Sequence, residues 1–476
     1  MIGLARLAAP IACLGLAVLL LARTRRNRIA GLGYAAVGTA LLAASLKPGA
    51  AGDVAVAVIG ILVLGAGLAW LFSREPWLVA YLTLGCIPVQ VHFLHHQLLA
   101  PLYVVAAGAA FNLLRELVQG DVRVREFGLA TRPLALYLVW LGLSLGWTVD
   151  VRNGALDILG VYLPFAILAL AIARLPWDSL RVKLLYGELV AMALVFVAVG
   201  VYQYETRNLF ENPKLITANS YAALFRVNSV FYDPSVYGRF LVVALIPTTV
   251  LIVRGRSLRA GLAALAFAVV AWIGLLISFS QSSFTALFVA VFCLSAIVWR
   301  WKSLAILVAA LVLIAGGAVA QPSLVQALRH HGVSEINKLA SGRGSLIYNG
   351  ILIARAHPAI GVGVGGFSHA YSKRTGRTPR KSASHNTPVT VAAEGGAIGF
   401  ILYAWLVIAM LRRAFRRIDR SLLGDASLAV ALALVAIFIH SNAYNDFFED
   451  PTTWTVMGLI ALTATARRAR SAMIQP

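Results

Sequence analysis

The sequence has little charge, and above all little negative charge. Of its 476 residues only 13% are charged and 19 are Asp or Glu, whereas 60% are apolar. Globular proteins average roughly 25% charged and 45–50% apolar residues, so this composition excludes an ordinary soluble domain. Because the apolar excess must face lipid rather than an oversized core, the sequence predicts a polytopic membrane protein.

Cysteine and metal-binding patterns are also scarce. The three cysteines all lie inside apolar runs, at Cys13, Cys86 and Cys293. Neither a disulfide framework nor a zinc site is therefore indicated. No Asp-x-Asp motif occurs, and His92, His95 and His96 have helical spacing but lack an acidic complement. An interfacial histidine cluster is favoured over a metal site, and we expect neither a metal nor a cofactor.

Apolar windows of about 20 residues predict fifteen candidate membrane spans. The fourth carries Pro88, so we expect it to be broken or tilted against the fifth. The fold class predicted is an all-α polytopic membrane protein with about 12–15 transmembrane helices and one long outer-face loop containing short helices. The predicted spans are centred near Gly15, Val37, Leu62, Leu84, Ala106, Leu141, Pro164, Leu194, Ala244, Val269, Phe288, Ala309, Gly399, Ala433 and Val456.

The net charge of +22, from 41 Lys and Arg, would suggest nucleic acid in a soluble chain. Here most cations gather in alternate short linkers, which is the pattern of cytoplasmic loops. The excess is therefore read as a topology signal, with the amino terminus outside. The lipid bilayer is the expected partner, and nucleic acid is not.

One outer linker, residues 321–386, is basic for a different reason. It carries nine cations against one acid, Glu335. Loops longer than about 60 residues escape the charge rule, so topology neither forbids this basicity nor explains it. An anionic ligand on the outer face is therefore implied. The cations are Arg329, Lys338, Arg343, Arg355, Lys373, Arg374, Arg377, Arg380 and Lys381.

Four regions follow from this pattern. Residues 1–132 are predicted to form amino-terminal transmembrane helices, and 133–320 core helices with an outer loop at 205–235. Residues 321–386 form the basic extracytoplasmic loop, and 387–476 the carboxy-terminal helices. All nine histidines fall on or near the outer face in this arrangement, which points to proton-transfer chemistry outside the cytosol.

The sharpest local pattern is Ser384-His385-Asn386, with Glu394 nine residues later. At the mouth of the bilayer, His385 is suited to act as a general base. An intramembrane carboxylate is costly and marks either function or a partnered contact. The alternative is an interfacial histidine beside a packing acid paired with an arginine, and the spacing alone leaves both readings open.

Two further segments near the predicted outer face carry charge. Asp233-Pro234 is typical of a helix cap with proline in the first turn, whereas Arg226 suits phosphate oxygens. Arg239, one turn into the same span, is expected to snorkel to the lipid head groups. The acidic run 445–450 is expected to pair with the basic loop. The glycine run 361–366 predicts a turn that lets backbone approach a ligand or a neighbouring helix.

Together these pieces resemble the O-antigen ligase and O-antigen polymerase superfamily of bacterial membrane glycosyltransferases. The resemblance spans residues 226–406, under half of the chain. Departures are Gln281, where many members have arginine, and Ser235, where asparagine is common. The matching pieces are Arg226 with 231–238, 278–282, 341–343, 357–363, and His385-Asn386 with Glu394-x-Gly396.

The resemblance implies transfer of a glycan from a polyprenyl diphosphate carrier to a hydroxyl acceptor, a glycan or glycolipid, at the outer face of the bacterial cytoplasmic membrane. No metal is then needed, because guanidinium groups neutralise the leaving diphosphate. His385 and Glu394 are the catalytic candidates, and Arg226 and Arg343 the diphosphate ligands. Candidates for supporting roles are Asp233, Asn386, Arg355 and Gln281.

Three alternatives remain open from the sequence. A polysaccharide ligase and a glycan polymerase share donor chemistry and differ in acceptor, and the ligase is slightly favoured. A transporter or flippase of lipid-linked glycans or anions would use the same arginines as a path, although no internal repeat typical of transporters is visible. A structural scaffold with a merely basic outer loop is the third.

Overall fold

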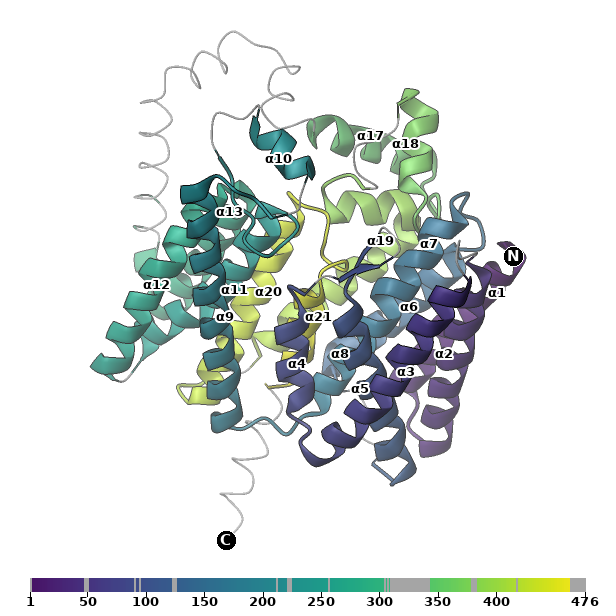
Figure 1. The fold of residues 1–476 in the computed structure, drawn as a ribbon, viewed down its shortest axis with the longest axis horizontal. Coiled ribbons are helices and arrows are strands. Elements are labelled where there is room, and N and C mark those ends of the chain that lie inside the picture. Colours follow the sequence, from purple (N-terminus) through teal and green to yellow (C-terminus); the bar gives the residue numbers. More distant parts are fainter. Residues whose placement is uncertain are drawn as a thin grey trace.

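The computed structural model describes residues 2–46, 51–89, 91–93, 96–121, 126–210, 213–220, 225–255, 257–303, 305, 308, 343–377, 383–416 and 418–462 (Figure 1). Ten helices in this part of the chain are long and apolar enough to cross a membrane. The predicted all-α polytopic membrane protein is thereby confirmed.

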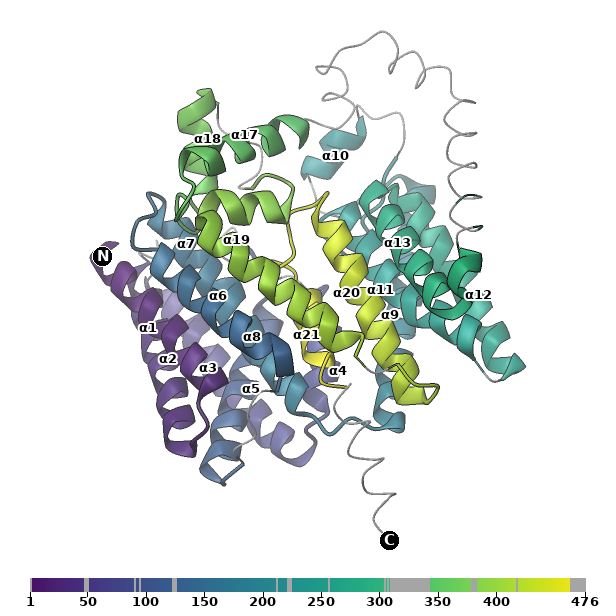
Figure 2. The ribbon, with the colours of Figure 1, turned by 180° about the vertical axis from the view of Figure 1, so that it is seen from behind.

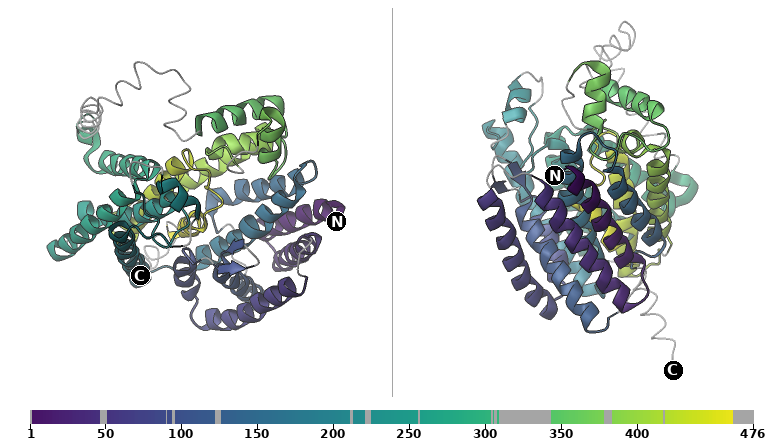
Figure 3. Two further views of the ribbon diagram at one scale, coloured as in Figure 1. Left: turned by 45° about the horizontal axis from the view of Figure 1, so that its top comes forward. Right: turned by 90° about the vertical axis from the view of Figure 1, so that its right-hand side faces the viewer.

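The amino-terminal helices form one side of the molecule (Figures 1 and 3). In this group α1 packs on α2 and α6, and α3 packs on α5. The elements are α1 (Ile2–Leu21), α2 (Arg25–Ser45), α3 (Ala51–Arg74), α4 (Leu78–Cys86), β1 (Val91–Phe93), β2 (His96–Leu98), α5 (Ala100–Val118), η1 (Gly128–Ala130), α6 (Thr131–Ser144), α7 (Val151–Asp157), the π-helical turn η2 (Ile158–Tyr162) and α8 (Leu163–Arg174).

A second group of helices forms the other side, and the carboxy-terminal helices join the two. Seen from behind, α19 lies beside α6 and α20 (Figure 2). Helix α20 also contacts α11 and α13, while α21 packs on α8. The elements are α9 (Ser179–Thr206), α10 (Pro213–Ser220), α11 (Pro234–Arg254), α12 (Leu258–Ser278), α13 (Gln281–Trp299), η3 (Arg300–Lys302), α17 (Arg343–Ala356), α18 (Phe367–Thr375), α19 (Thr387–Ala414), α20 (Leu422–Ser441) and α21 (Pro451–Leu459).

The short helices α10, α17 and α18 lie at one end of the bundle, which is also the end toward which α1 begins (Figures 1 and 3). Both α17 and α18 belong to the linker expected to contain short helices. This end also holds the start of α19, so we call it the His385 end.

Polar side-chain caps explain where nine of the described α-helices begin. A side-chain oxygen placed just before a helix accepts an N–H of the first turn that has no helical partner. Asp233 does this for α11, where Pro234 follows in the first turn, as the sequence predicted. The same arrangement begins helices at Thr24, Asp150, Asp178, Ser257, Ser280, Asn386, Ser421 and Asp450.

In the described part of the chain, ten helices are long and apolar enough to be spans, compared with the fifteen expected over the whole sequence. Every predicted centre except Ala309, which lies outside the described residues, falls on a helix. However, α4, α6 and α21 have only 9, 14 and 9 residues, too few to cross the bilayer alone. Hydropathy windows counted them because the turns at their ends are also apolar.

The fourth predicted span is interrupted, as expected from Pro88. Helix α4 ends at Cys86, and the chain then forms a short antiparallel hairpin in which His92 pairs with Gln97 and Phe93 with His96. The helical spacing expected for His92 and His96 was therefore wrong, and His95 lies outside the described residues. Proline ends the helix because it cannot donate to the preceding turn.

Buried charges stabilise the end of the bundle opposite the His385 end. Glu126 accepts from Arg28 at 2.7 Å and from Arg174 at 2.9 Å, and all three side chains are at most 3% exposed. Arg174 also contacts Glu116 and Asp121. Buried charges of this kind are tolerated only when paired, so this cluster ties α2 and α8 to the segment before α6.

Candidate active site

Helix α19 is broken in its outer half, at Gly396. This residue has φ +63° and ψ −162°, values outside the helical region. Backbone N–H and C=O groups at the break lose their helical hydrogen-bond partners, and backbone groups of residues 358–363 bond them instead. The bonds run from Val362 N to Ala393 O (3.0 Å), from Gly363 N to Glu394 O (2.9 Å) and from Ala397 N to Pro358 O (2.8 Å).

Glycine is required where this loop meets the helix. A Cβ on Gly361, whose φ is +68°, would lie 2.2 Å from the Glu394 carbonyl oxygen. A Cβ on Gly396 would lie 2.4 Å from the carbonyl carbon of Ala359. The glycine run therefore serves a close backbone approach to a neighbouring helix, one of the two roles that the sequence predicted.

His385 lies in a tight turn immediately before α19. Its φ is +64°, a left-handed conformation that is unusual for a residue with a side chain. The turn is fixed on both sides: Ser384 Oγ donates to the Asn386 carbonyl at 2.8 Å, and Asn386 caps α19 while its Nδ2 donates to the Asn442 carbonyl at 2.9 Å. Such strain persists only where the surroundings impose it, and it is common at active sites.

Tyr444 lies between two histidine rings. Its ring centroid is 5.9 Å from that of His385 and 5.9 Å from that of His440. The Tyr444 hydroxyl donates to the Asp233 carboxylate, which also caps α11. Burial raises the pKa of Tyr444, and the negative charges of Asp233 and Asp446 raise it further. The tyrosine therefore stays protonated and connects His385 to the loop that precedes α11.

Arg239 is buried in α11 and pairs with Asp446 and Asp450 of the last outer loop. It is only 2% exposed, so the expectation that it snorkels to the lipid head groups was wrong. Among the described residues the acidic run does not pair with the basic loop as expected, because Asp446 and Asp450 pair with this arginine. Burial raises the pKa of Asp446, but the charges and hydrogen bonds of Arg239 and His440 together outweigh this effect, and the pKa lies below its usual range.

His440, at the end of α20, extends this buried cluster. Its Nε2 lies 3.0 Å from the Ser282 hydroxyl, and its Nδ1 lies 3.9 Å from Asp446 Oδ1. Ser282 comes from α13, so four segments of the chain meet here. The predicted neighbour Gln281 is instead exposed.

Arg226 lies in the loop before α11, on the side of α10 and α12. Asn219 of α10 accepts from the Arg226 backbone N–H at 3.2 Å and donates to its carbonyl at 2.9 Å. The Arg226 Nε donates to the Ser278 carbonyl, at the end of α12, at 3.2 Å. The backbone of Arg226 is thus held by α10 and its guanidinium by the end of α12, seven residues before Asp233.

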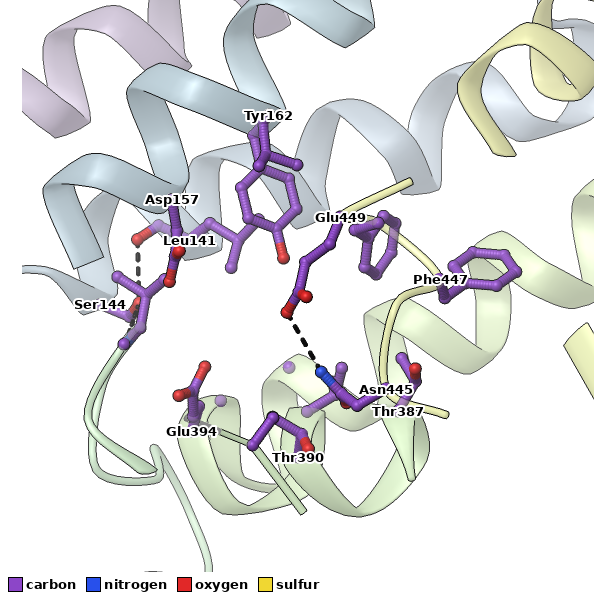
Figure 4. A pocket seen from close by; sticks show the side chains of 18 of the residues that line it. Leu141, Ser144, Asp157, Tyr162, Thr387, Thr390, Glu394, Asn445, Phe447 and Glu449 are labelled. Atoms are coloured by element: carbon purple, nitrogen blue, oxygen red, sulfur yellow. Dashed lines mark hydrogen bonds between the residues drawn. The ribbon is translucent and has the colours of Figure 1, made fainter. Parts of the chain in front are cut away.

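Glu394 is nine residues after His385, about 13 Å farther along a helix axis. Its Oε1 accepts from the Phe367 backbone N–H at 3.1 Å. The same side chain lines a cavity of about 250 Å³, shown in Figure 4. Glu394 therefore contacts the glycine-rich loop, and its catalytic role stays a prediction.

The basic loop contributes less to the described site. Arg343 begins α17, and its side chain lies outside what the structure describes. Arg355 is exposed in the last turn of α17. On α18 and just after it, Lys373, Arg374 and Arg377 are also exposed. The part of this loop that is described thus presents positive charge at the His385 end.

Sequence reasoning missed several residues around His385. These were the ones that reach the site from distant segments, namely Ser282, His440 and Tyr444, together with Asp446 and Asp450 as the partners of Arg239. The sequence did contain a signal for Asp446 and Asp450, because acidic residues are rare in this chain. No local pattern marks Tyr444, because its partner Asp233 is far away in the sequence.

Residues 265–404 match the family model described as O-antigen ligase. The match covers most of α12, all of α13, α17 and α18, and the outer part of α19, and so includes His385 and Glu394. Arg226 lies outside it. No curated protein matches the chain. This segment, under half of the chain, is thus similar to the O-antigen ligase family.

Proposed function

We propose that the protein transfers a glycan from a polyprenyl diphosphate carrier to a hydroxyl acceptor at the outer face of the bacterial cytoplasmic membrane, as a polysaccharide ligase. The observation that carries this is the position of His385. It is 8% exposed, lies in a constrained turn at the mouth of a membrane helix, and falls inside the family match. Tyr444 and Asp233 connect it to the loop of Arg226.

The proposed step is a single displacement. A ring nitrogen of His385 takes the proton of the acceptor hydroxyl. The oxygen then forms a bond to the anomeric carbon of the donor sugar, and the bond from that carbon to the phosphate oxygen breaks. The carrier diphosphate leaves with the electron pair, and the proton on His385 passes to solvent.

Arg226, with Arg343, is proposed to neutralise the charge that develops on the departing diphosphate. Guanidinium groups hold phosphate oxygens in a fixed fork, and their value rises where water is excluded. The Arg226 backbone and Nε are already held by Asn219 and Ser278, so the group needs little reorganisation. Within the described residues, no cluster of three or more His, Cys, Asp or Glu could hold a metal ion, and we propose a metal-independent reaction.

The test uses purified protein in lipid nanodiscs with a synthetic polyprenyl-diphosphate oligosaccharide and a panel of acceptors. We expect glycan transfer with release of carrier diphosphate, unchanged by EDTA. His385→Ala should lower the rate about 10²–10⁴-fold, and Arg226→Ala about 10²–10³-fold. The matched control is His369→Ala, an exposed histidine of α18, which should retain the wild-type rate.

Several outcomes would contradict the proposal. A wild-type rate for His385→Ala would contradict the assignment of His385 as the base. Loss of activity in EDTA would contradict a metal-independent reaction. Movement of the intact donor across vesicles without bond cleavage would favour a flippase instead. The acceptor that works separates the two enzyme classes: a lipid-linked acceptor glycan on the same carrier indicates a polymerase, and any other glycolipid a ligase.

A further inference from the structure

A cavity of about 250 Å³ lies beside the turn of His385 and is not used by the step proposed above. Its walls come from α6, η2, the start of α19, the glycine-rich loop and the last outer loop. Figure 4 shows the carboxylates of Asp157, Glu394 and Glu449 directed into one space, with Tyr162 on its wall. This convergence of groups from distant segments is what a binding site requires.

The charge of the cavity defines what it can hold. None of its lining residues is Lys or Arg, whereas four are acids: Asp157, Glu394 and Glu449, together with Asp446, which pairs with Arg239. A phosphate or carboxylate ligand would find no cationic side chain in this lining. Neutral hydroxyl groups or an ammonium group would be attracted, because a carboxylate accepts strong hydrogen bonds from them.

Two polar groups in the cavity lack protein partners. Thr387 is 3% exposed, lines the cavity, and its hydroxyl has no hydrogen-bond partner in the described residues. Over the same residues, nothing donates a hydrogen bond to the Asp157 carboxylate. Buried polar groups are nearly always satisfied, so both are positioned to bond a ligand.

The remaining walls are aromatic. Trp140, Tyr137, Tyr162 and Phe448 line the cavity, and the Trp140 Nε1 is occupied by the Gly395 carbonyl at 3.0 Å. Flat apolar surfaces beside carboxylate, amide and hydroxyl groups match a sugar ring, whose faces carry C–H groups and whose edge carries hydroxyls. A lipid chain would leave these polar groups unpaired.

The cavity lies next to the turn that contains the proposed base, His385. Thr387 is two residues after His385, and the lining residue Asn445 follows Tyr444. Arg226 instead contacts α10 and the end of α12, in the other helix group. The cavity thus adjoins the turn of His385, whereas the proposed diphosphate ligand Arg226 is held by α10 and α12.

We propose that this cavity is a subsite for an uncharged or amino sugar of the acceptor glycan, which it presents to His385. This rests on the proposed function, and it adds the chemical class that the acceptor end must have. Asp157 and Thr387 bond the sugar, and the aromatic wall packs on its face. An anionic sugar is disfavoured, because the lining holds four acidic side chains and neither Lys nor Arg.

Direct binding tests the subsite without any turnover. Saturation-transfer NMR on the protein in nanodiscs would use cellobiose, N,N′-diacetylchitobiose, chitobiose with free amines, and glucuronic acid. We expect signals from neutral or amino sugars and none from glucuronic acid. The double variant Asp157→Asn/Thr387→Val should weaken binding about tenfold or more, while Glu205→Gln, an exposed carboxylate of α9, should not. Equal signals from wild type and double variant, or no neutral or amino sugar bound, would overturn the subsite.

Kinetics in the transfer assay identify which substrate the subsite serves. Asp157→Asn should raise the KM for acceptor about tenfold and leave the KM for donor within about twofold. A change in the donor KM alone would overturn the assignment to the acceptor. Sugar binding that depends on Asp157, together with no transfer by the wild type, would count against the proposed function and leave the subsite standing.

Discussion

The ring of Tyr444 stands nearly perpendicular to that of His385, with 72° between the planes and 5.9 Å between the centroids. The backbone of His385 is set by its own turn, whereas its ring contacts a residue from the last outer loop. Tyr444 is in turn bonded to Asp233 at the start of α11. The candidate base is therefore oriented by three segments, and the predictions below begin with this contact.

Two substitutions of Tyr444 distinguish the role of its ring from that of its hydroxyl. Tyr444→Phe keeps the ring against His385 and loses only the bond to Asp233, so we expect a stability loss of about 1 kcal/mol and less than a tenfold loss of rate. Tyr444→Ala removes the ring and should lower the rate much further. Initial rates and thermal unfolding in nanodiscs measure both. Equal rates for the two variants would show that the ring does not position His385.

The pair of Arg239 and Asp446 makes stability depend on pH. The pKa of Asp446 in the folded protein lies below its ordinary value of 3.8. The folded state therefore binds fewer protons, and the stabilisation is fully present above that value. It should be lost as the pH falls below 3.8 and through the lower folded-state pKa.

Thermal unfolding from about pH 3 to 7 measures this effect. Asp446→Asn should be less stable than wild type at neutral pH, by less than the about 3–5 kcal/mol typical of a charge that loses its only partner, because Asp450 still pairs with Arg239. The difference from wild type should shrink as the pH is lowered. A constant difference across this range would contradict the pairing.

The buried cluster at the opposite end should affect stability without affecting catalysis. Glu126→Gln leaves Arg28 buried with a neutral partner, whereas Arg174 keeps Glu116 and Asp121, and we expect a loss of about 3–5 kcal/mol. The cluster is remote from His385, since Gly128 beside it contacts Arg413 near the far end of α19. The rate per folded molecule should therefore be unchanged. The control is Glu75→Gln, an exposed acid, and a stability loss equal to that of the control would refute the cluster's role.

Neighbouring glycines in α19 provide a matched test of the helix break. At Gly396 an alanine would meet the carbonyl of Ala359 and adopt a positive φ, so Gly396→Ala should lower the folded yield and cost more than about 1–3 kcal/mol. At Gly395 the nearest atom to a Cβ is Trp140 Nε1 at 3.4 Å, and alanine should be tolerated. Expression and unfolding temperature measure both. Comparable behaviour of the two variants would mean that the break can close.

The sequence was sufficient for those features that are local. Apolar runs predicted the helices, Asp233-Pro234 predicted a cap, and Pro88 predicted an interruption. Hydropathy could not measure helix length, so α4, α6 and α21 were counted as full spans. Hydropathy also could not predict which charged residues form pairs. Arg239 and Asp446 are about 200 residues apart in the sequence, and their contact depends on how α11 and the last outer loop pack.

The same limit applies to the site. His385 stood out because histidine at a membrane boundary is chemically conspicuous, and Arg226 because no cap explains an arginine there. Tyr444 and Asp157 carry no such signal, since a tyrosine or a single acid at a helix end is ordinary. Their roles come from the cavity and contacts that form only when α6, α19 and the last outer loop meet.

The loop that repairs the break in α19 has a consequence for how the chain is assembled. Hydrocarbon offers no substitute for a missing backbone hydrogen bond, so the outer half of this helix is stable in the bilayer only after residues 358–363 have docked on it. Those residues emerge from the ribosome first, and in the proposed topology they lie across the membrane. We therefore expect ordered biogenesis, in which translocation of residues 358–363 precedes the final seating of α19.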